Sequence, residues 1–115
     1  QELLAQNRSD DWVLPLRQQW RDRYLAVLRW LSRHAAANGE FAECAQLCAE
    51  VLAVDPCHEE AHRELIRAYA ALGQPDLVQT QYRNCVKALS RELGIAPSAE
   101  TTALYRDVTR SGRQA

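Results

Sequence analysis

The chain has 115 residues, enough for one hydrophobic core but too few for two independent cores. Hydrophobic residues make up 47% and charged residues 25%, which is ordinary for a folded globular domain and excludes wholesale disorder. A formal net charge of -1 excludes the basic excess that nonspecific DNA binding needs, and without a signal peptide or an apolar run of about 20 residues the chain is expected to be cytoplasmic, with no membrane span.

The first predicted element is a long helix from residue 12 to about residue 38, preceded by a flexible lead-in at residues 1–11. A polar cluster at residues 9–11 suits a helix N-terminus, Pro15 is tolerated in a first turn, and Gly39 suits a left-handed C-terminus. Apolar residues recur in steps of three and four, which we interpret as one stripe: Leu16, Trp20, Tyr24, Leu28, Leu31 and Ala35. Trp20 is expected in the core, whereas Trp30, about 80° away around the helix, is expected at the edge or outside.

Four further amphipathic helices follow in chain order. The second begins near Phe41 and is closed by Asp55-Pro56, and the third runs from residue 58 to 72, where Gly73 ends it. The fourth extends from Pro75 to about residue 93. A rigid linker at residues 94–97 leads to a short capping helix at residues 98–110, and residues 111–115 form a frayed tail. No segment alternates with period two, so the predicted fold class is all-α.

An internal repeat relates the first and second halves of this pattern. Gly39 and Gly73 are 34 residues apart, and the same offset pairs Leu31 with Leu65 and Cys44 with Val78, among others. That period is typical of tetratricopeptide repeats, each a pair of antiparallel helices. We therefore predict a tetratricopeptide-like α-α superhelix of about five helices over residues 12–110, with repeats near residues 25–56 and 59–93.

A specific family likeness is carried by three groups of residues. They are Asp11-Trp12 with Tyr24-Leu25, the run Asp55-Pro56-Cys57-His58-Glu59-Glu60-Ala61-His62, and the run Glu92-Leu93-Gly94-Ile95-Ala96-Pro97-Ser98. From Asp11 to Val108 the chain resembles the bacterial transcriptional activator domain, which follows a winged-helix DNA-binding domain in regulators of the SARP and AfsR type.

The resemblance implies an intracellular regulator whose domain mediates oligomerisation, contacts with neighbouring domains and contacts with the transcription machinery, including RNA polymerase. No winged-helix segment is present in this sequence, and the chain is therefore expected to be the C-terminal part of a longer protein. DNA binding is expected only through that upstream domain, and no membrane contact is expected. The alternative is a stand-alone tetratricopeptide adaptor that captures a peptide or a signalling partner.

Candidate partner-binding residues fall into three groups. First helices of tetratricopeptide units usually line the concave face, which favours Arg63 and Arg67 as a site for an acidic partner. An exposed tryptophan is a reasonable interface anchor, so Trp30 is a candidate. The remaining candidates are the flanking arginines and an apolar stripe that needs a partner for self-association: Arg29, Arg33, Leu16, Trp20 and Tyr24.

No catalytic, cofactor or metal site is predicted from the residue patterns of this sequence. Cys57, His58 and His62 are the only cluster with metal-ligand residue types, but no second ligand pair supports it, so polarity at a helix start is the better interpretation. There is no glycine-rich phosphate loop, no HExxH motif and no catalytic carboxylate pair. We therefore expect no catalytic residue, no cofactor and no metal. A metal or thiol sensor is the third possible function, after the regulator domain and the peptide adaptor.

Overall fold

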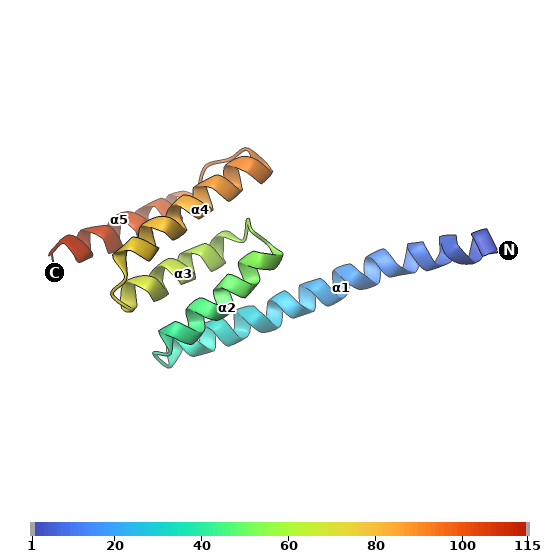
Figure 1. Cartoon of the computed structure of the whole chain (residues 1–115), viewed down its shortest axis with the longest axis horizontal. Helices are drawn as coiled ribbons and strands as arrows, with labels where there is room; N and C mark the ends of the chain where they lie inside the picture. The colour runs from blue at the N-terminus through green and yellow to red at the C-terminus, as the bar shows by residue number, and fades with distance from the viewer. Residues whose placement is uncertain (1, 115) are drawn as a thin grey trace.

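The computed structural model describes the backbone of residues 2–114 and the side chains of residues 13–112. All regular structure in that part is helical, and its five helices are α1 (Glu2–Ala37), α2 (Phe41–Val54), α3 (Glu59–Ala71), α4 (Pro75–Leu93) and α5 (Ala99–Gln114). The predicted all-α class is confirmed. Helices α1 to α4 pack in chain order, each on its predecessor, because short turns make consecutive helices antiparallel neighbours (Figure 1).

The same turn closes both helical hairpins. Gly39 and Gly73 have φ values of 75° and 70°, in the left-handed region where a side chain would cost about 1 kcal/mol. The amide of Glu40 donates to Ala35 O at 2.8 Å, and the amide of Gln74 donates to Tyr69 O at 3.0 Å. Both bonds belong to the Schellman arrangement that satisfies terminal helix carbonyls. The α1–α2 and α3–α4 hairpins thus share one turn, at the 34-residue spacing found in the sequence.

Two predicted helix boundaries are wrong. Helix α1 begins at Glu2 and not near Trp12, so the predicted lead-in is helical from Glu2 onward and Pro15 lies inside the helix. Residues 2–6 are Glu, Leu, Leu, Ala and Gln, which are good helix formers, and they extend the helix upstream of the proline. Helix α5 continues to Gln114 and does not end near residue 110, because Gly112 stays out of the left-handed region that ends the other helices.

The core lies where α2 and α3 pack between the C-terminal half of α1 and helix α4. Its fully buried apolar side chains come mainly from α2, α3 and α4: Cys44, Cys48, Val51, Leu65, Ile66, Cys85 and Leu89. Three of the four cysteines therefore act as small buried apolar residues, and Cys57 is half-buried.

Helix α1 extends well beyond this core. Its 36 residues span about 54 Å, whereas α2 has only 14 residues and covers only the C-terminal part of α1 (Figure 1). Arg21 donates from Nη2 to Val54 O at 2.9 Å, which places the end of α2 beside the middle of α1. The N-terminal half of α1 consequently projects from the helical body, and the molecule reaches 70 Å in its longest dimension.

Candidate protein-interaction surface

The most exposed apolar surface lies on α1. We define the outer face of α1 as six side chains, each more than a third exposed: Leu16, Trp20, Tyr24, Val27, Trp30 and Leu31. Trp20 is 62% and Trp30 63% exposed. An exposed apolar patch of this extent marks an interaction site more often than it marks ordinary surface.

The expected location of Trp20 in the core is therefore wrong, and helix geometry gives the reason. A helix turns about 100° per residue, so each step of four advances about 40° around the axis. Three such steps carry the stripe from Leu16 to Leu28, onto a different side of α1. Leu28 and Ala35 are buried, whereas Leu16, Trp20, Tyr24 and Leu31 are exposed. The predicted stripe joins residues of two faces, one packed on the core and one turned to solvent.

Both tryptophans of the outer face are supported by a neighbour one turn further along α1. The guanidinium carbon of Arg23 lies 5.9 Å from the centroid of the Trp20 ring. The rings of Trp30 and His34 stack with centroids 5.2 Å apart and an interplanar angle of 6°. These contacts restrict the rotamers of two large side chains, which lowers the entropy lost when a partner covers them. The exposure of Trp30 agrees with its expected position outside the core.

Arg29 and Arg33, expected on a partner surface, take part in an ion-pair network between α1 and α3. Arg29 is 6% exposed, with Nη2 at 3.1 Å from Glu60 Oε1 and Nη1 at 3.3 Å from Glu64 Oε1. Arg33 is exposed and donates to Glu60 Oε1 at 2.7 Å. Burial alone would raise the pKa of Glu60, but the two arginines outweigh it and leave that pKa below its ordinary value. Arg29 is thus a structural residue that joins α1 to α3.

Among the side chains that the structure describes, none accepts a hydrogen bond from Arg29 Nη2 or Nε, although Nη2 is close to Glu60. Arg29 Nη2 and Glu60 Oε1 are close enough for an ion pair but do not have the geometry of a hydrogen bond, so their attraction is electrostatic. The burial of a guanidinium with unpaired donors is tolerated mainly because neighbouring carboxylates balance its charge.

Arg63, expected on a concave binding face, is held by α3 and α5. Its Nη1 donates to Thr101 Oγ1 at 3.0 Å, and its guanidinium lies 3.8 Å from Glu59 and 3.7 Å from Glu100. Its side chain is 14% exposed. Arg67 is exposed and lines a cavity of about 230 Å³ together with Arg33 and Phe41. Of the two arginines, only Arg67 presents its charge to solvent.

Helix α5 is attached through Glu59. The Glu59 carboxylate accepts hydrogen bonds from the Ser98 amide at 2.7 Å and from the Thr101 hydroxyl, and the Ser98 hydroxyl caps the α5 N-terminus by accepting from the Thr101 amide. Burial alone would raise the pKa of Glu59, but these hydrogen bonds and the charge of Arg63 outweigh it, so the pKa lies below its ordinary value.

Replacing Glu59 with glutamine is expected to remove a pH-dependent part of the stability. A lowered pKa in the folded state means that the carboxylate stabilises the fold above pH 4.5 and loses this effect as pH falls through the folded pKa. The gap in unfolding free energy between wild type and Glu59→Gln should therefore be wide at pH 7 and narrow towards pH 3, as measured by urea denaturation. A gap that stays constant over this range would contradict the assignment.

The cysteine and histidine candidates near the α2–α3 turn do not converge on a metal site. His58 caps α3, with Nδ1 accepting from the Ala61 amide at 3.1 Å, and Cys57 Sγ contacts Ala88 O at 3.4 Å. His62 is buried, with Nε2 at 2.8 Å from Pro56 O and Nδ1 at 2.8 Å from Gln81 Nε2. The carbonyl contact assigns the ring proton to Nε2, and burial lowers the pKa of His62. These side chains thus fasten the turn to α4.

A cluster that no sequence pattern predicts lies between α2 and α3. Cys44 and Cys48 are one turn apart on α2, and Glu64 of α3 lies beside both thiols. Glu64 is 16 residues from Cys48 along the chain. Only the packing of α2 against α3 brings them together, so no local spacing signals it.

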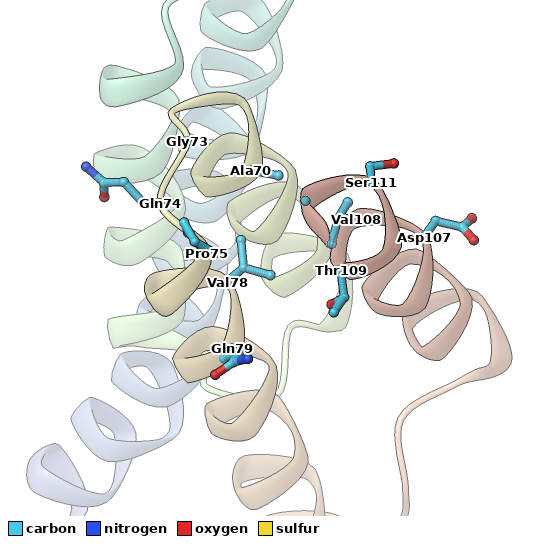
Figure 2. A pocket seen from close by; sticks show the side chains of 11 residues that line it. Ala70, Gly73, Gln74, Pro75, Val78, Gln79, Asp107, Val108, Thr109 and Ser111 are labelled. Atoms are coloured by element: carbon cyan, nitrogen blue, oxygen red, sulfur yellow. The ribbon is translucent and has the colours of Figure 1, made fainter. Parts of the chain in front are cut away.

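A cavity of about 650 Å³ lies between the α3–α4 turn and the C-terminal half of α5. Figure 2 shows Val78 of α4 and Val108 of α5 facing each other across it, while Asp107 points away. Its lining also includes Gly73 and Pro75 from the turn. The cavity is apolar and brings no set of reactive groups together.

Comparison with known proteins identifies the family of this domain. None of the described helices combines the length and apolarity needed to cross a membrane. No curated protein and no solved structure matches the chain significantly. The family model for the bacterial transcriptional activator domain matches residues 1–109, nearly the whole chain, in agreement with the resemblance found in the sequence. The chain belongs to the bacterial transcriptional activator domain family.

Proposed function

We propose that this domain is the protein-interaction and oligomerisation module of a bacterial transcriptional regulator, that it acts in the cytoplasm, and that it binds partners and catalyses no reaction. The observation that carries the proposal is the outer face of α1, where six large apolar side chains lie exposed on a projecting helix. Such a surface would let a transcriptional activator-type domain join regulator copies or contact other proteins.

The partner that fits this face best is a second copy of the chain. At about 100 Å² for each exposed side chain, the outer face would bury about 600 Å² per copy and about 1,200 Å² in a dimer, the lower limit of a stable specific interface. Among the described side chains, Arg23 and His34 stack on its aromatic rings. Asp22, the one carboxylate within residues 16–31, is two positions from both Trp20 and Tyr24 and therefore lies on another side of the helix. In a twofold arrangement each outer face covers the other, so both copies bury the same apolar surface.

Sedimentation equilibrium over a wide concentration range tests this proposal. We expect a reversible monomer–dimer equilibrium that depends weakly on salt, because the contact is apolar. A monomer at all concentrations would contradict self-association. The peptide-adaptor alternative is disfavoured because the charge of Arg63 is already balanced by Glu59 and Glu100.

We also propose that the regulator contacts DNA through a winged-helix domain on the N-terminal side of this one, and that neighbouring domains and RNA polymerase are further partners. Family membership supports this part. The reading frame upstream of the Gln1 codon is expected to encode a winged helix. A frame that opens immediately before that codon would contradict the expectation.

A further inference from the structure

Two thiols and a carboxylate meet at the contact between α2 and α3. Cys44 and Cys48 are one helical turn apart, and both are fully buried. The Sγ atoms lie 3.7 and 3.5 Å from Glu64 Oε1. All three ligand atoms lie within 4.8 Å of one another. Glu64 is itself largely buried, with 13% of its side chain exposed.

Two of the three ligand-to-ligand distances in this cluster match the coordination shell of a tetrahedral zinc ion, and the two sulfurs lie within 4.8 Å of each other. With Zn–S near 2.3 Å and Zn–O near 2.0 Å, tetrahedral angles require about 3.5 Å between a sulfur and an oxygen ligand, and about 3.8 Å between two sulfurs. The two sulfur–oxygen distances, 3.5 and 3.7 Å, agree with that requirement. An ion could enter the cluster with only small side-chain movements.

We propose that Cys44, Cys48 and Glu64 form a binding site for a thiophilic divalent ion of the zinc type, with the two thiolates and the Glu64 carboxylate as its three protein ligands. The proposal does not rest on the proposed function, because the site shares no residue with the outer face of α1. It differs from the Cys57–His58–His62 grouping, whose side chains are engaged elsewhere.

Access and the fourth coordination position are provided by the cavity of about 230 Å³ beside the cluster. Cys44 and Glu64 both line it, whereas Arg33 and Arg67 contribute to its wall. A water molecule in this cavity would complete a tetrahedral shell.

The charges balance when the ion binds. An ordinary thiol is protonated near neutral pH, so binding releases the two thiol protons to solvent as the metal–sulfur bonds form. Two thiolates and one carboxylate leave the bound divalent ion with a net charge of -1. The guanidinium of Arg29, with Nη1 at 3.3 Å from Glu64 Oε1, offsets it and orients the carboxylate.

Titration of the chelator-treated protein with cadmium tests the site, because cadmium–thiolate bonds absorb in the near ultraviolet and report ligation directly. We expect one equivalent to bind with the absorbance of two thiolates, two protons released per ion, and displacement by excess zinc. The Cys44→Ala and Cys48→Ala variants should each lose at least half of the absorbance. Glu64→Gln should bind at least tenfold more weakly while keeping both thiols.

The chain offers two matched controls. Cys85 is as buried as Cys44 but belongs to α4, and Cys57 is the half-buried thiol. Cys85→Ala and Cys57→Ala should bind cadmium like the wild type. Circular dichroism verifies that each variant is folded. Absence of stoichiometric binding in the wild type, or unchanged binding by a folded variant lacking both Cys44 and Cys48, would overturn the proposal.

Discussion

Replacing Trp20 with alanine is expected to dissociate the proposed dimer while leaving the folded domain intact. The side chain is 62% exposed, so the folded monomer hardly depends on it, and the free energy of unfolding should change by no more than about 0.5 kcal/mol. A tryptophan in the middle of an apolar interface typically contributes about 2 kcal/mol or more. The dimer dissociation constant should therefore rise by about 30-fold or more in sedimentation equilibrium.

Leu93→Ala is the matched control for Trp20→Ala. Leu93 is 57% exposed and lies at the end of α4, outside the outer face of α1. A general loss of exposed apolar surface would weaken association in both variants, whereas a specific interface requires only Trp20. Equal dissociation constants for the two variants would contradict the assignment of the dimer contact to the outer face of α1.

Replacing Arg29 with methionine is expected to destabilise the chelator-treated domain by about 3–5 kcal/mol, the usual loss when one partner of a buried ion pair is removed. The change leaves the Glu64 carboxylate, 13% exposed, without its buried cation. Methionine retains most of the buried hydrocarbon, so the loss reports on charge more than on packing. Urea denaturation measures the free energy of unfolding.

Arg33→Met is the control, since Arg33 also pairs with Glu60 but its side chain is 59% exposed. An exposed pair of this kind contributes at most about 1 kcal/mol. The double variant Arg29→Met with Glu64→Met should regain much of the stability, because an apolar pair can replace a buried ion pair. If Arg29→Met destabilises no more than Arg33→Met, the network has no special role in joining α1 to α3.

These two predictions separate the two roles of α1. Its core side holds the arginine that joins it to α3, while its outer face holds the tryptophan proposed to bind a second copy. The substitutions are nine residues apart on one helix, yet one is expected to change folding and the other association. This division explains how a single long helix can both complete the helical body and present a surface to a partner.

Much of the fold was determined by the sequence alone, because its signals are local. Gly39, Gly73 and Gly94 each end a helix in the left-handed conformation, and a glycine at a helix end is recognisable without knowledge of any neighbour. The spacing of Ala61, Leu65 and Ala68 on α3 is likewise a local signal, and all three are buried because that short helix is covered on one continuous side.

Only the tertiary structure decided which face of α1 is buried and which side chains meet across helices. Apolar residues surround much of α1, and the sequence does not say which of them α2 and α3 cover, so Trp20 was placed on the wrong side. The Arg29 network and the Cys44–Cys48–Glu64 cluster likewise depend on the register in which α3 packs against α1 and α2. That register is set by side-chain packing between helices distant in sequence, whereas helix ends and turns are set by the backbone preferences of a few adjacent residues.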